Sequence, residues 1–444
     1  MTDLPRGWAS ARLDEVADVQ LGKMLDRVKN RGEPTAYLRN VNVRWGGFDL
    51  TDLAEMRMTP QDRDMFQIVD KDVLVCEGGE PGRAAVWRMG PTKVAFQKAL
   101  MRVRCAAGFQ SDLLVAYLRH AQADAILEKS FTGTTIKHLP QGTLRGLTVP
   151  VPPSAEQRRI VAKLDALTAR TAKARAELDR VPAVAARYKQ ALLGRSLASD
   201  LSGHELVPLR SMLTTLTSGS RDWSPYYDRG TAIFVLAGNV RPMAFDPAAR
   251  RHVDPPRDAA DARRSRLASG DLLLTIVGAG TGDLCAVPDL QGEYYVCQSV
   301  ALLRLRDPRL SRFLEYWFQS EAHGRGAIDA ATYGAARPHL AFDDIGAFPV
   351  PDVTLDAAER AVAELDRRFA EIDRLAAEAA VARRLLDRLD RAILAKAFRG
   401  ELVPQYPDDE PASIMLDRIR AERDAAPGSG RRRSSGAAAL KIAP

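Results

Sequence analysis

The chain has 444 residues, 46% of them hydrophobic, and a formal net charge of +7 at pH 7. This length and composition are typical of a globular protein with two or three domains. No apolar run approaches the ~18–20 residues of a membrane-spanning helix. The N-terminal stretch MTDLPRGWASARLDEVADV carries acidic residues and lacks the apolar core of a signal peptide. We therefore expect a cytoplasmic protein, and its basic charge is mild evidence for a polyanionic partner.

Residues 1–150 are predicted to form an α+β globular unit. Short β-branched runs bounded by Gly or Pro predict strands at Asp72–Cys76 and Lys93–Val103. Ser111–Phe131 has the periodicity of a helix. The cysteines of the whole chain are scattered without C-x-x-C spacing, so we predict neither a disulfide framework nor a metal site; they are Cys76, Cys105, Cys285 and Cys297.

Residues 151–202 are predicted to form a central spacer helix. Ser154 and Gln157 are spaced as a capping box after Pro153. Apolar residues then recur at intervals of four and three, with Thr171 at the one polar position, which indicates a coiled-coil seam. Pro182 should kink this helix or break it into two segments. The predicted seam comprises Ile160, Leu164, Leu167, Ala174, Leu178, Val181, Ala185, Tyr188 and Leu192.

Residues 203–352 are predicted to form a second globular unit, and residues 353–404 a distal spacer helix. Strands are expected at Leu272–Val277 and Val300–Leu305, and a helical stretch at Arg309–Ala330. Gly400 should end the distal helix, as Gly203 ends the first. Its seam comprises Val362, Leu365, Phe369, Ile372, Ala379, Leu386, Leu389 and Ile393. Residues 405–444 are predicted to be a short helix and a disordered tail rich in Gly, Ser and Ala.

The two halves of the chain repeat each other. DKDVLVCEGGEPGRAAVW (Asp70–Trp87) corresponds to SGDLLLTIVGAGTGDLCAV (Ser269–Val287), and AFQKALMRVR (Ala95–Arg104) to YVCQSVALLRLR (Tyr295–Arg306). A period of about 200 residues indicates a domain duplication, because solenoid repeats are only ~20–50 residues long.

Each long helix carries charged residues on its other faces, so neither can bury its apolar stripe alone. Each could bind a separate partner. Antiparallel pairing within the chain is favoured, because the chain must return to place the second unit. The predicted fold class is therefore α+β, with two similar globular units separated by two long antiparallel coiled-coil helices related by a pseudo-two-fold axis.

Several motifs resemble the specificity subunits of type I restriction–modification systems. They are the VPVPPSAEQRRIVAKLDAL entry to the first spacer helix, its RYKQALL exit, the GTTIKHL loop and LDRAILAKAFRGELVPQYPDDEPASIMLDRIRAER near the C-terminus. The resemblance covers nearly the whole chain. Two stretches depart from it: the first spacer ends in the longer GRSLASDLSGHELVP, and the second loop, YGAARPHL, lacks the Thr pair of GTTIKHL.

The resemblance implies a non-catalytic protein that recognises DNA sequence. Each globular unit would be a target recognition domain that reads one half of a bipartite double-stranded target. The helices would set the gap between the half-sites and bind two methyltransferase (modification) subunits. Restriction/translocase subunits would join for cleavage, and S-adenosylmethionine would bind only in the methyltransferase partners.

Two other classes of protein were weighed. TIVGAGTGDL (Thr275–Leu284) resembles an S-adenosylmethionine loop, and DPPR (Asp254–Arg257) resembles a methyltransferase Asp-Pro-Pro-aromatic site. Both readings are rejected, because the aligned first copy loses the Gly spacing and Arg257 cannot stack on a flipped base. No Walker loop or zinc motif is present. A DNA methyltransferase using Gly278–Gly282 and a coiled-coil adaptor without DNA binding remain as alternatives.

DNA-contact candidates are polar or basic residues in predicted loops of the globular units. Arg and Lys suit guanine or phosphate, and Asn and Gln suit adenine. Asn42 and Asn239 could instead be turn caps, and the repeated His138 and His339 could be loop anchors. The candidates are Lys23, Arg27, Lys29, Arg39, Asn42, Arg44, Gln97, Thr134, Thr135, Lys137 and His138 in the first unit, and Ser220, Arg221, Asn239, Arg241, Gln298, Arg337 and His339 in the second.

Overall fold

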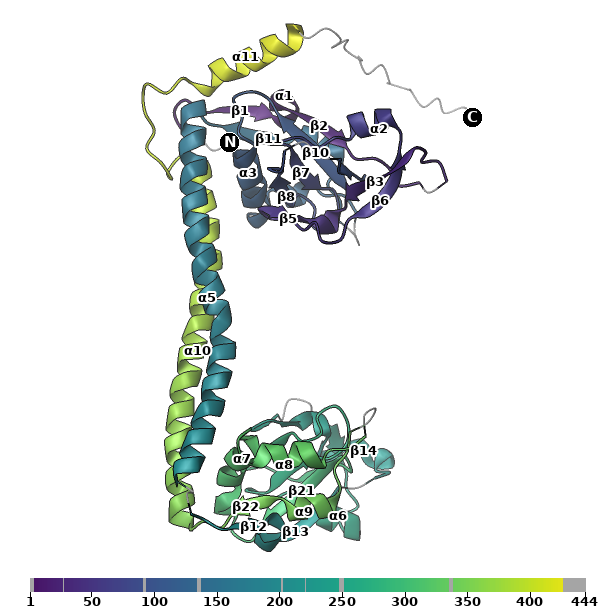
Figure 1. Ribbon diagram of the computed structural model, residues 1–444, viewed down its shortest axis with the longest axis vertical. Coiled ribbons are helices and arrows are strands. Elements are labelled where there is room, and N and C mark those ends of the chain that lie inside the picture. Colours follow the sequence, from purple (N-terminus) through teal and green to yellow (C-terminus); the bar gives the residue numbers. More distant parts are fainter. Residues whose placement is uncertain are drawn as a thin grey trace. The chain divides into compact units, whose positions relative to one another are not determined.

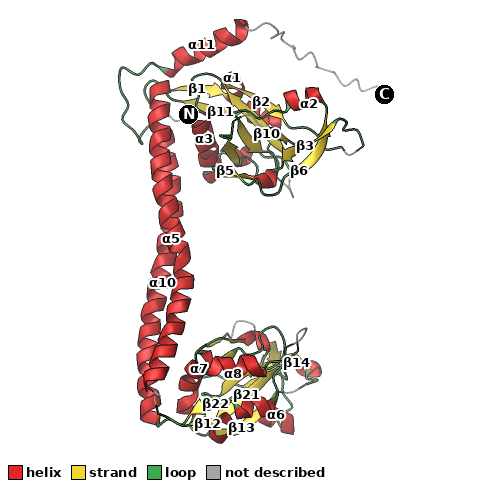
Figure 2. Ribbon diagram, in the orientation of Figure 1, coloured by secondary structure: helices red, strands yellow, loops and turns green. Residues whose placement is uncertain are grey.

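The computed structural model describes residues 4–26, 28–90, 93–133, 137–200, 203–219, 221–246, 251–334 and 338–425 (Figure 1). The chain divides into unit 1, Met1–Ala176 with Arg383–Pro444, and unit 2, Glu177–Ala382. Each contains helices and strands (Figure 2). The long helices α5 (Ser154–Asp200) and α10 (Leu355–Phe398) contribute to both units. The predicted α+β class with two sheet-containing parts and two long helices is confirmed. The pseudo-two-fold axis and the domain boundaries stay predictions.

Unit 1 contains two main sheets. Its elements are β1 (Ala9–Arg12), α1 (Leu13–Val16), β2 (Ala17–Leu21), β3 (Glu33–Leu38), β4 (Val43–Arg44), β5 (Gly47–Phe48), β6 (Ala54–Met58), α2 (Pro60–Met65), β7 (Val73–Cys76), β8 (Ala84–Val86), β9 (Ala95–Phe96), β10 (Leu100–Cys105), α3 (Ser111–Ala123), α4 (Gln141–Arg145) and β11 (Thr148–Val151). One sheet is antiparallel with the order β2-β10-β7-β8. The other has the order β6-β3-β9, with β9 parallel to β3. Apolar residues of α3 pack on the first sheet, where Leu113 and Leu118 join the core around Val73 and Val75.

Unit 2 repeats this arrangement. Its elements are β12 (Leu206–Pro208), β13 (Leu213–Ser218), β14 (Tyr227–Val235), β15 (Val240–Arg241), β16 (Ala244–Phe245), β17 (Arg251–Val253), α6 (Ala260–Ser265), β18 (Leu272–Thr275), β19 (Leu284–Ala286), β20 (Tyr294–Val296), β21 (Val300–Leu305), α7 (Ser311–Gln319), α8 (Gly324–Ala331), α9 (Phe342–Ala347) and β22 (Pro349–Pro351). The sheet orders are β13-β21-β18-β19 and β17-β14-β20, with β20 parallel to β14. The duplication inferred from sequence is therefore a duplication of topology.

Three predicted elements are interrupted in the structure. Lys93–Val103 is two strands, because β9 pairs with β3 in one sheet and β10 pairs with β2 and β7 in the other. The helix predicted at Ser111–Phe131 ends at Ala123, and Ala125 adopts a left-handed φ of 57°. Arg309–Ala330 forms α7 and α8, which are separated by a short turn.

The two long helices lie side by side in each unit (Figure 1). In unit 1, Arg175 of α5 forms ion pairs of 2.9 Å with Asp387 and Asp390 of α10. In unit 2, Lys189 of α5 lies 2.6 Å from Asp373 of α10. As residue numbers rise along α5, their partners' numbers fall along α10, so the helices are antiparallel. α10 ends in a Schellman motif, in which the Glu401 N–H donates to the Lys396 carbonyl after Gly400 at φ 72°.

The predicted seam is wrong at three residues, Ala174, Tyr188 and Leu389. All three are exposed, Tyr188 by 54% and Leu389 by 47%. Their neighbours Arg175, Lys189 and Asp390 take the inward positions, where the interhelical ion pairs satisfy the charges. In each of these neighbouring pairs, the sequence-based prediction turned the apolar residue toward the other helix. In the structure the charged residue of the pair faces the other helix.

One predicted detail of α5 is also wrong, and of the kink or break predicted at Pro182 the break does not occur. The Gln157 side chain makes no capping box with Ser154: its amide donates to the Pro152 carbonyl and its carbonyl oxygen accepts from the Gln110 N–H, both at 2.9 Å. Pro182 does not break α5, which continues to Asp200. Pro182 is exposed, so water can satisfy the carbonyl that loses its helical partner.

The C-terminal helix α11 (Ala412–Ala425) belongs to unit 1. Met415, Leu416 and Ile419 are at most 4% exposed and lie in the same core as Val16 and Phe109. The Ala412 N–H donates to the Gly7 carbonyl at 2.9 Å, and Arg420 forms an ion pair of 3.0 Å with Glu15. The tail predicted beyond this helix lies outside the described residues. No described helix is long and apolar enough to span a lipid bilayer.

Candidate nucleic-acid interface

One tight turn in each unit links the two main sheets. We call residues 97–99 crossover turn 1 and residues 297–299 crossover turn 2. In turn 1, Gln97 donates its N–H to Leu38 (3.1 Å), Leu100 donates to Gln97 (2.8 Å), and Ala99 accepts from Glu77 (2.9 Å). The turn is therefore bonded to a strand of one sheet and to the residue that follows a strand of the other, which fixes the position of its exposed middle residue.

Crossover turn 2 has the same bonds. Cys297 donates its N–H to Val235 (2.9 Å), Val300 donates to Cys297 (3.2 Å), and Ser299 accepts from Ile276 (2.9 Å). The register therefore aligns Gln97 with Cys297, which is 4% exposed, and Lys98 with Gln298.

Sequence reasoning selected Gln97 and Gln298 and missed Lys98. The repeat had already supplied the signal, because AFQKAL and YVCQSV align Lys98 with Gln298. Lys98 and Gln298 are both exposed, and no described residue makes a hydrogen bond or ion pair with either side chain.

A glycine holds the preceding strand against each turn. A Cβ on Gly22 would lie 2.2 Å from the Gln97 carbonyl oxygen, and a Cβ on Gly219 would lie 1.5 Å from that of Val296. Real Cβ atoms cannot approach backbone so closely. These glycines let the chain leave β2 and β13 close beside the crossover turns.

A Gly219→Ala substitution should therefore destabilise unit 2 by about 1–3 kcal/mol or more, because the backbone of β20 must move. Amide hydrogen exchange along β21 (Val300–Leu305) should become faster. Gly238→Ala is the matched control, since a Cβ there would meet nothing within 4 Å. Equal protection of β21 in both variants would show that this close approach is not required.

A second loop in each unit is held beside the turn that follows β7 or β18. Thr132 and His138 exchange main-chain hydrogen bonds of 2.9 and 2.8 Å, and Leu139 donates to the Glu77 carbonyl at 2.8 Å. The counterparts in unit 2 are the Tyr333–His339 pair and the bond from Leu340 to Ile276. The repeated His thus marks a repeated loop closure. The loop tips, with the predicted contacts Thr134, Thr135 and Arg337, lie outside the described residues, as do Arg27 and Ser220.

Unit 2 has a recess of about 240 Å³ at crossover turn 2. It is lined by Arg221, Asp222, Val277, Gln298 and Ser299. Two predicted contacts from separate segments, Arg221 and Gln298, therefore meet at one place.

Several predicted contacts have structural roles. Asn42 and Asn239 are each 2% exposed, and their amides donate to the carbonyls of Asp49 and Asp246 across the same turn of each unit. They are turn caps, and adenine contact is wrong for both because their polar atoms are engaged inside the fold.

Lys23 and Arg39 are also engaged within unit 1. Lys23 forms an ion pair of 2.8 Å with Asp62, and Arg39 one of 2.6 Å with Asp52. Burial would raise the pKa of the Asp62 carboxyl, but hydrogen bonds from Lys23 and Thr59 outweigh it and lower that pKa. The other described candidates keep their status as predictions. Lys29, Arg44, Lys137, His138 and Arg241 are exposed, and His339 is half-buried with its ring 3.9 Å from that of Tyr333.

The glycine motif Gly278–Gly282 is a hairpin turn. β18 and β19 are antiparallel on either side of it, with Leu274 opposite Leu284. Gly278 and Gly282 adopt φ values of 108° and 93°, which glycine tolerates. No helix follows the first strand to present its N-terminus to a cofactor, so the S-adenosylmethionine reading loses its structural basis. Among the described residues, no cluster of His, Cys, Asp or Glu could hold a metal ion.

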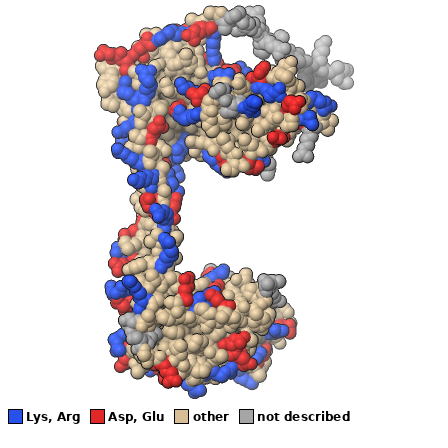
Figure 3. All heavy atoms as spheres, in the orientation of Figure 1, with Lys and Arg blue, Asp and Glu red and all other residues tan. Residues whose placement is uncertain are grey.

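Charge alone does not mark a DNA-binding face. On the face shown in Figure 3, Lys and Arg side chains are interspersed with Asp and Glu over both the helices and the globular parts. This face therefore carries no single basic patch, and the loop geometry is the better guide to a candidate DNA contact.

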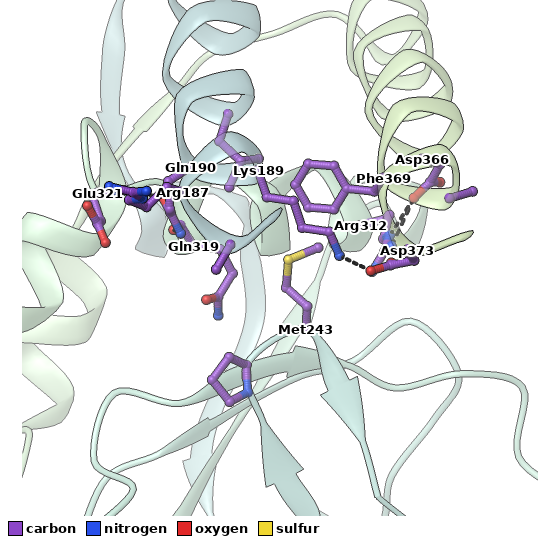
Figure 4. Close-up of a pocket in the computed structure, with 14 residues that line it drawn as sticks. Arg187, Lys189, Gln190, Met243, Arg312, Gln319, Glu321, Asp366, Phe369 and Asp373 are labelled. Atoms are coloured by element: carbon purple, nitrogen blue, oxygen red, sulfur yellow. Dashed lines mark hydrogen bonds and ion pairs between the residues drawn. The ribbon is translucent and has the colours of Figure 1, made fainter. Parts of the chain in front are cut away.

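Each unit also has a groove between its long helices and its globular part. In unit 2 the groove has a volume of about 920 Å³, and its lining includes Lys189, Met243, Arg312, Asp366 and Asp373 (Figure 4). Arg312 and Asp366 form an ion pair of 2.8 Å. Burial lowers the pKa of the Arg312 guanidinium, but the hydrogen bond to Asp366 and the charge of Glu315 outweigh it, so the pKa is raised.

The groove of unit 1 is about 720 Å³ and lies at the corresponding place. Trp45 of the β4–β5 turn borders it, as Met243 of the β15–β16 turn borders the other. Asp112 and Asp165 line it from α3 and α5. Burial, and then the charge of Asp112, raise the pKa of the Asp165 carboxyl.

Comparison with known proteins identifies the class. Residues 5–181 match the family described as type I restriction modification DNA specificity domain. The chain is 25% identical to the Escherichia coli type I restriction enzyme EcoBI specificity subunit, over 95% of this chain and 93% of that protein. It is 22% identical to the EcoKI specificity subunit of Escherichia coli K12, over 96% of this chain and 97% of that protein.

Solved structures show the same fold. One comes from a study of complex assembly and conformational transition of the type I R-M system, with a TM-score of 0.69, 22% identity, and coverage of 90% of this chain and all of that one. Another is the HsdS subunit from Thermoanaerobacter tengcongensis, with a TM-score of 0.57, 22% identity, and coverage of 90% and 98%.

The chain is thus a DNA-specificity protein rather than an enzyme. The resemblance inferred from sequence is confirmed: nearly the whole chain is similar to specificity subunits of type I restriction enzymes, and residues 5–181 match the type I restriction modification DNA specificity domain.

Proposed function

We propose that each unit reads one half of a bipartite duplex DNA target. The observation that carries this proposal is that the two crossover turns share one backbone structure but expose different side chains. Both crossover turns are fixed by the same main-chain bonds, yet one presents Lys98 and the other Gln298. A duplicated scaffold with divergent exposed residues suits two different half-sites, because bases are read by side chains on rigid supports.

Replacing residues 1–149 with another recognition domain should change one half-site and leave the other intact. The variant and the parent chain would each be co-expressed with the methyltransferase subunit, and methylated sites mapped across the host genome. The spacer helices and unit 2 serve as the unchanged internal reference. A simultaneous change of both half-sites would contradict independent reading.

We further propose two methyltransferase subunits as partners, one docked at each groove. The grooves lie at corresponding places and combine apolar with charged lining. Exposed apolar residues on the long helices, including Leu375, Leu385 and Leu389, offer further surface for such partners. In this proposal S-adenosylmethionine binds only in the methyltransferase subunits, restriction/translocase subunits join for cleavage, and the complex acts in the cytoplasm.

A DNA-binding experiment distinguishes the proposed function from the alternative of a coiled-coil adaptor that does not bind DNA. The complex should bind random duplexes weakly, with affinity that falls steeply as salt rises, since Lys and Arg side chains that neutralise phosphates release counterions. Binding of labelled S-adenosylmethionine to the isolated chain would favour the enzyme alternative. Absence of DNA binding by the purified complex at low salt would favour the adaptor.

A further inference from the structure

We propose that Lys98 and Gln298, the middle residues of the two crossover turns, are specificity-determining residues that read different bases. This inference rests on the proposed reading of one half-site by each unit. It assigns one base-reading position in each unit and a base preference to each.

The position is defined by the fold. Each turn has one bond to a strand of the β6-β3-β9 or β17-β14-β20 sheet and one to the residue after β7 or β18. Phe96 and Leu100 are fully buried and Cys297 is 4% exposed, whereas Gln97, Ala99 and Ser299 are half-buried. A single exposed side chain therefore projects from a support that is rigid on both sides.

The surroundings favour a base edge over a phosphate in unit 2. Gln298 borders the recess with Arg221 and Asp222. The Asp222 carboxylate would repel a phosphate, whereas it can accept a hydrogen bond from a base amino group. Arg221 is exposed, and no described residue pairs with its side chain, so it is available for a neighbouring base or the flanking phosphate.

The loop beside Lys98 exposes two apolar residues near its start, in contrast to the charged residues near Gln298. The loop that follows Gly22 begins with Lys23, whose carbonyl accepts from the Lys98 N–H at 2.9 Å. Met24 and Leu25 come next and are 58% and 45% exposed. Exposed apolar side chains at this position suit contact with a thymine methyl group, in contrast to the charged pair that follows Gly219 in unit 2.

The chemistry of the two side chains gives the base preference. The Gln298 amide has a donor and an acceptor, which match N7 and the N6 amino group of adenine in the major groove. The Lys98 ammonium has donors only, which match O6 and N7 of guanine. We therefore expect an A·T pair at the position read by Gln298 and a G·C pair at the position read by Lys98.

The experiment exchanges the two side chains in the full chain, co-purified with its methyltransferase subunit. The variants are Gln298→Lys, Gln298→Ala and Lys98→Gln. Gln291→Lys is the control, because Gln291 is exposed in the same unit on the loop before β20. Each complex would be given a randomised duplex library, and the methylated sequences counted by sequencing.

Gln298→Lys should shift preference at one base pair of one half-site from A·T toward G·C, by on the order of 10- to 100-fold. Gln298→Ala should relax the same position, and Lys98→Gln should alter one position of the other half-site. Gln291→Lys should reproduce the parent sequence.

Other outcomes distinguish a failure of this residue assignment from a failure of the proposed function. An unchanged sequence with all three variants, while the parent methylates a bipartite site, would overturn the assignment of these residues and leave the proposed function standing. A uniform loss of methylation at every sequence would also overturn it, since that result assigns the side chains to phosphate contact or folding. A parent complex that methylates no defined sequence would count against the proposed function itself.

Discussion

A Leu416→Asp substitution should destabilise unit 1 by at least about 3 kcal/mol and leave unit 2 folded. Leu416 is 4% exposed and packs in the core that also contains Val16, Leu113 and Ile160. Truncating a buried Leu costs about 2–5 kcal/mol, and a carboxylate at this position would also be buried without a partner. Because unfolding of a chain with two units is not two-state, the measurement is amide hydrogen exchange on β10 (Leu100–Cys105) and on β21 (Val300–Leu305).

The matched control is Ile414→Asp. Ile414 lies on the same helix and is 45% exposed, so its replacement should change exchange on β10 little. Exchange on β21 should match the parent chain in both variants. Equal protection of β10 in Leu416→Asp and in the parent chain would show that α11 is dispensable for unit 1.

A matched insertion of four residues in both long helices should lengthen the gap between the half-sites by one or two base pairs. The insertions would follow Ala176 in α5 and Ala382 in α10. The ion pairs of Arg175 in unit 1 and of Lys189 in unit 2 would then both be kept. Four residues add ~6 Å at ~1.5 Å per residue, and one base pair spans ~3.4 Å of duplex. The half-site sequences should not change, because no loop of either globular part is altered.

Two further insertions test whether helix pairing transmits the length. Two residues in each helix rotate the following seam by ~200° at 3.6 residues per turn, which turns the apolar stripe away from its partner. Inserting four residues in α5 alone makes α5 longer than the α10 segment with which it pairs. Both should lower methylation strongly, whereas the matched insertion should keep it. A fully active matched variant with the parent gap, mapped by methylation sequencing, would show that these helices do not set the spacing.

Much of the fold could be predicted because its signals are local or repeated. The helix that became α10 has heptad apolar residues and a terminal Gly400 in a Schellman motif, so its end followed from the sequence. Val300–Leu305 was predicted to the residue, since a short and mostly apolar run between turn residues forms a buried strand. The duplication allowed each element to be compared with its counterpart in the other half of the chain. The Gly278–Gly282 motif could be rejected as a cofactor loop because the first copy lacks its glycine spacing.

The errors arose where tertiary context overrides local pattern. Nothing in Lys93–Val103 itself shows that its two halves pair in different sheets, because only the partners β3 and β2 separate them. The seam errors at Tyr188 and Leu389 came from choosing apolar residues over charged ones, although Lys189 and Asp390 have partners across the helix pair. In the candidate site, the sequence left Asn42 and Asn239 open between adenine contacts and turn caps, and their hydrogen bonds inside the turn decide for the caps.

The placement of α11 in unit 1 determines the order in which the two units can complete their folding during synthesis. The first segment of unit 1 precedes unit 2 along the chain, but Ala412–Ala425 completes its core only after unit 2 has been synthesised. The roughly 200 residues of Glu177–Ala382 intervene, which takes ~10–40 s at ~5–20 residues per second. Unit 2 is encoded by one continuous segment and can close as soon as it is released. The nascent chain must therefore carry an unfilled apolar site beside Val16 and Phe109 until unit 2 has been made, and a chain truncated before Ala412 never fills it.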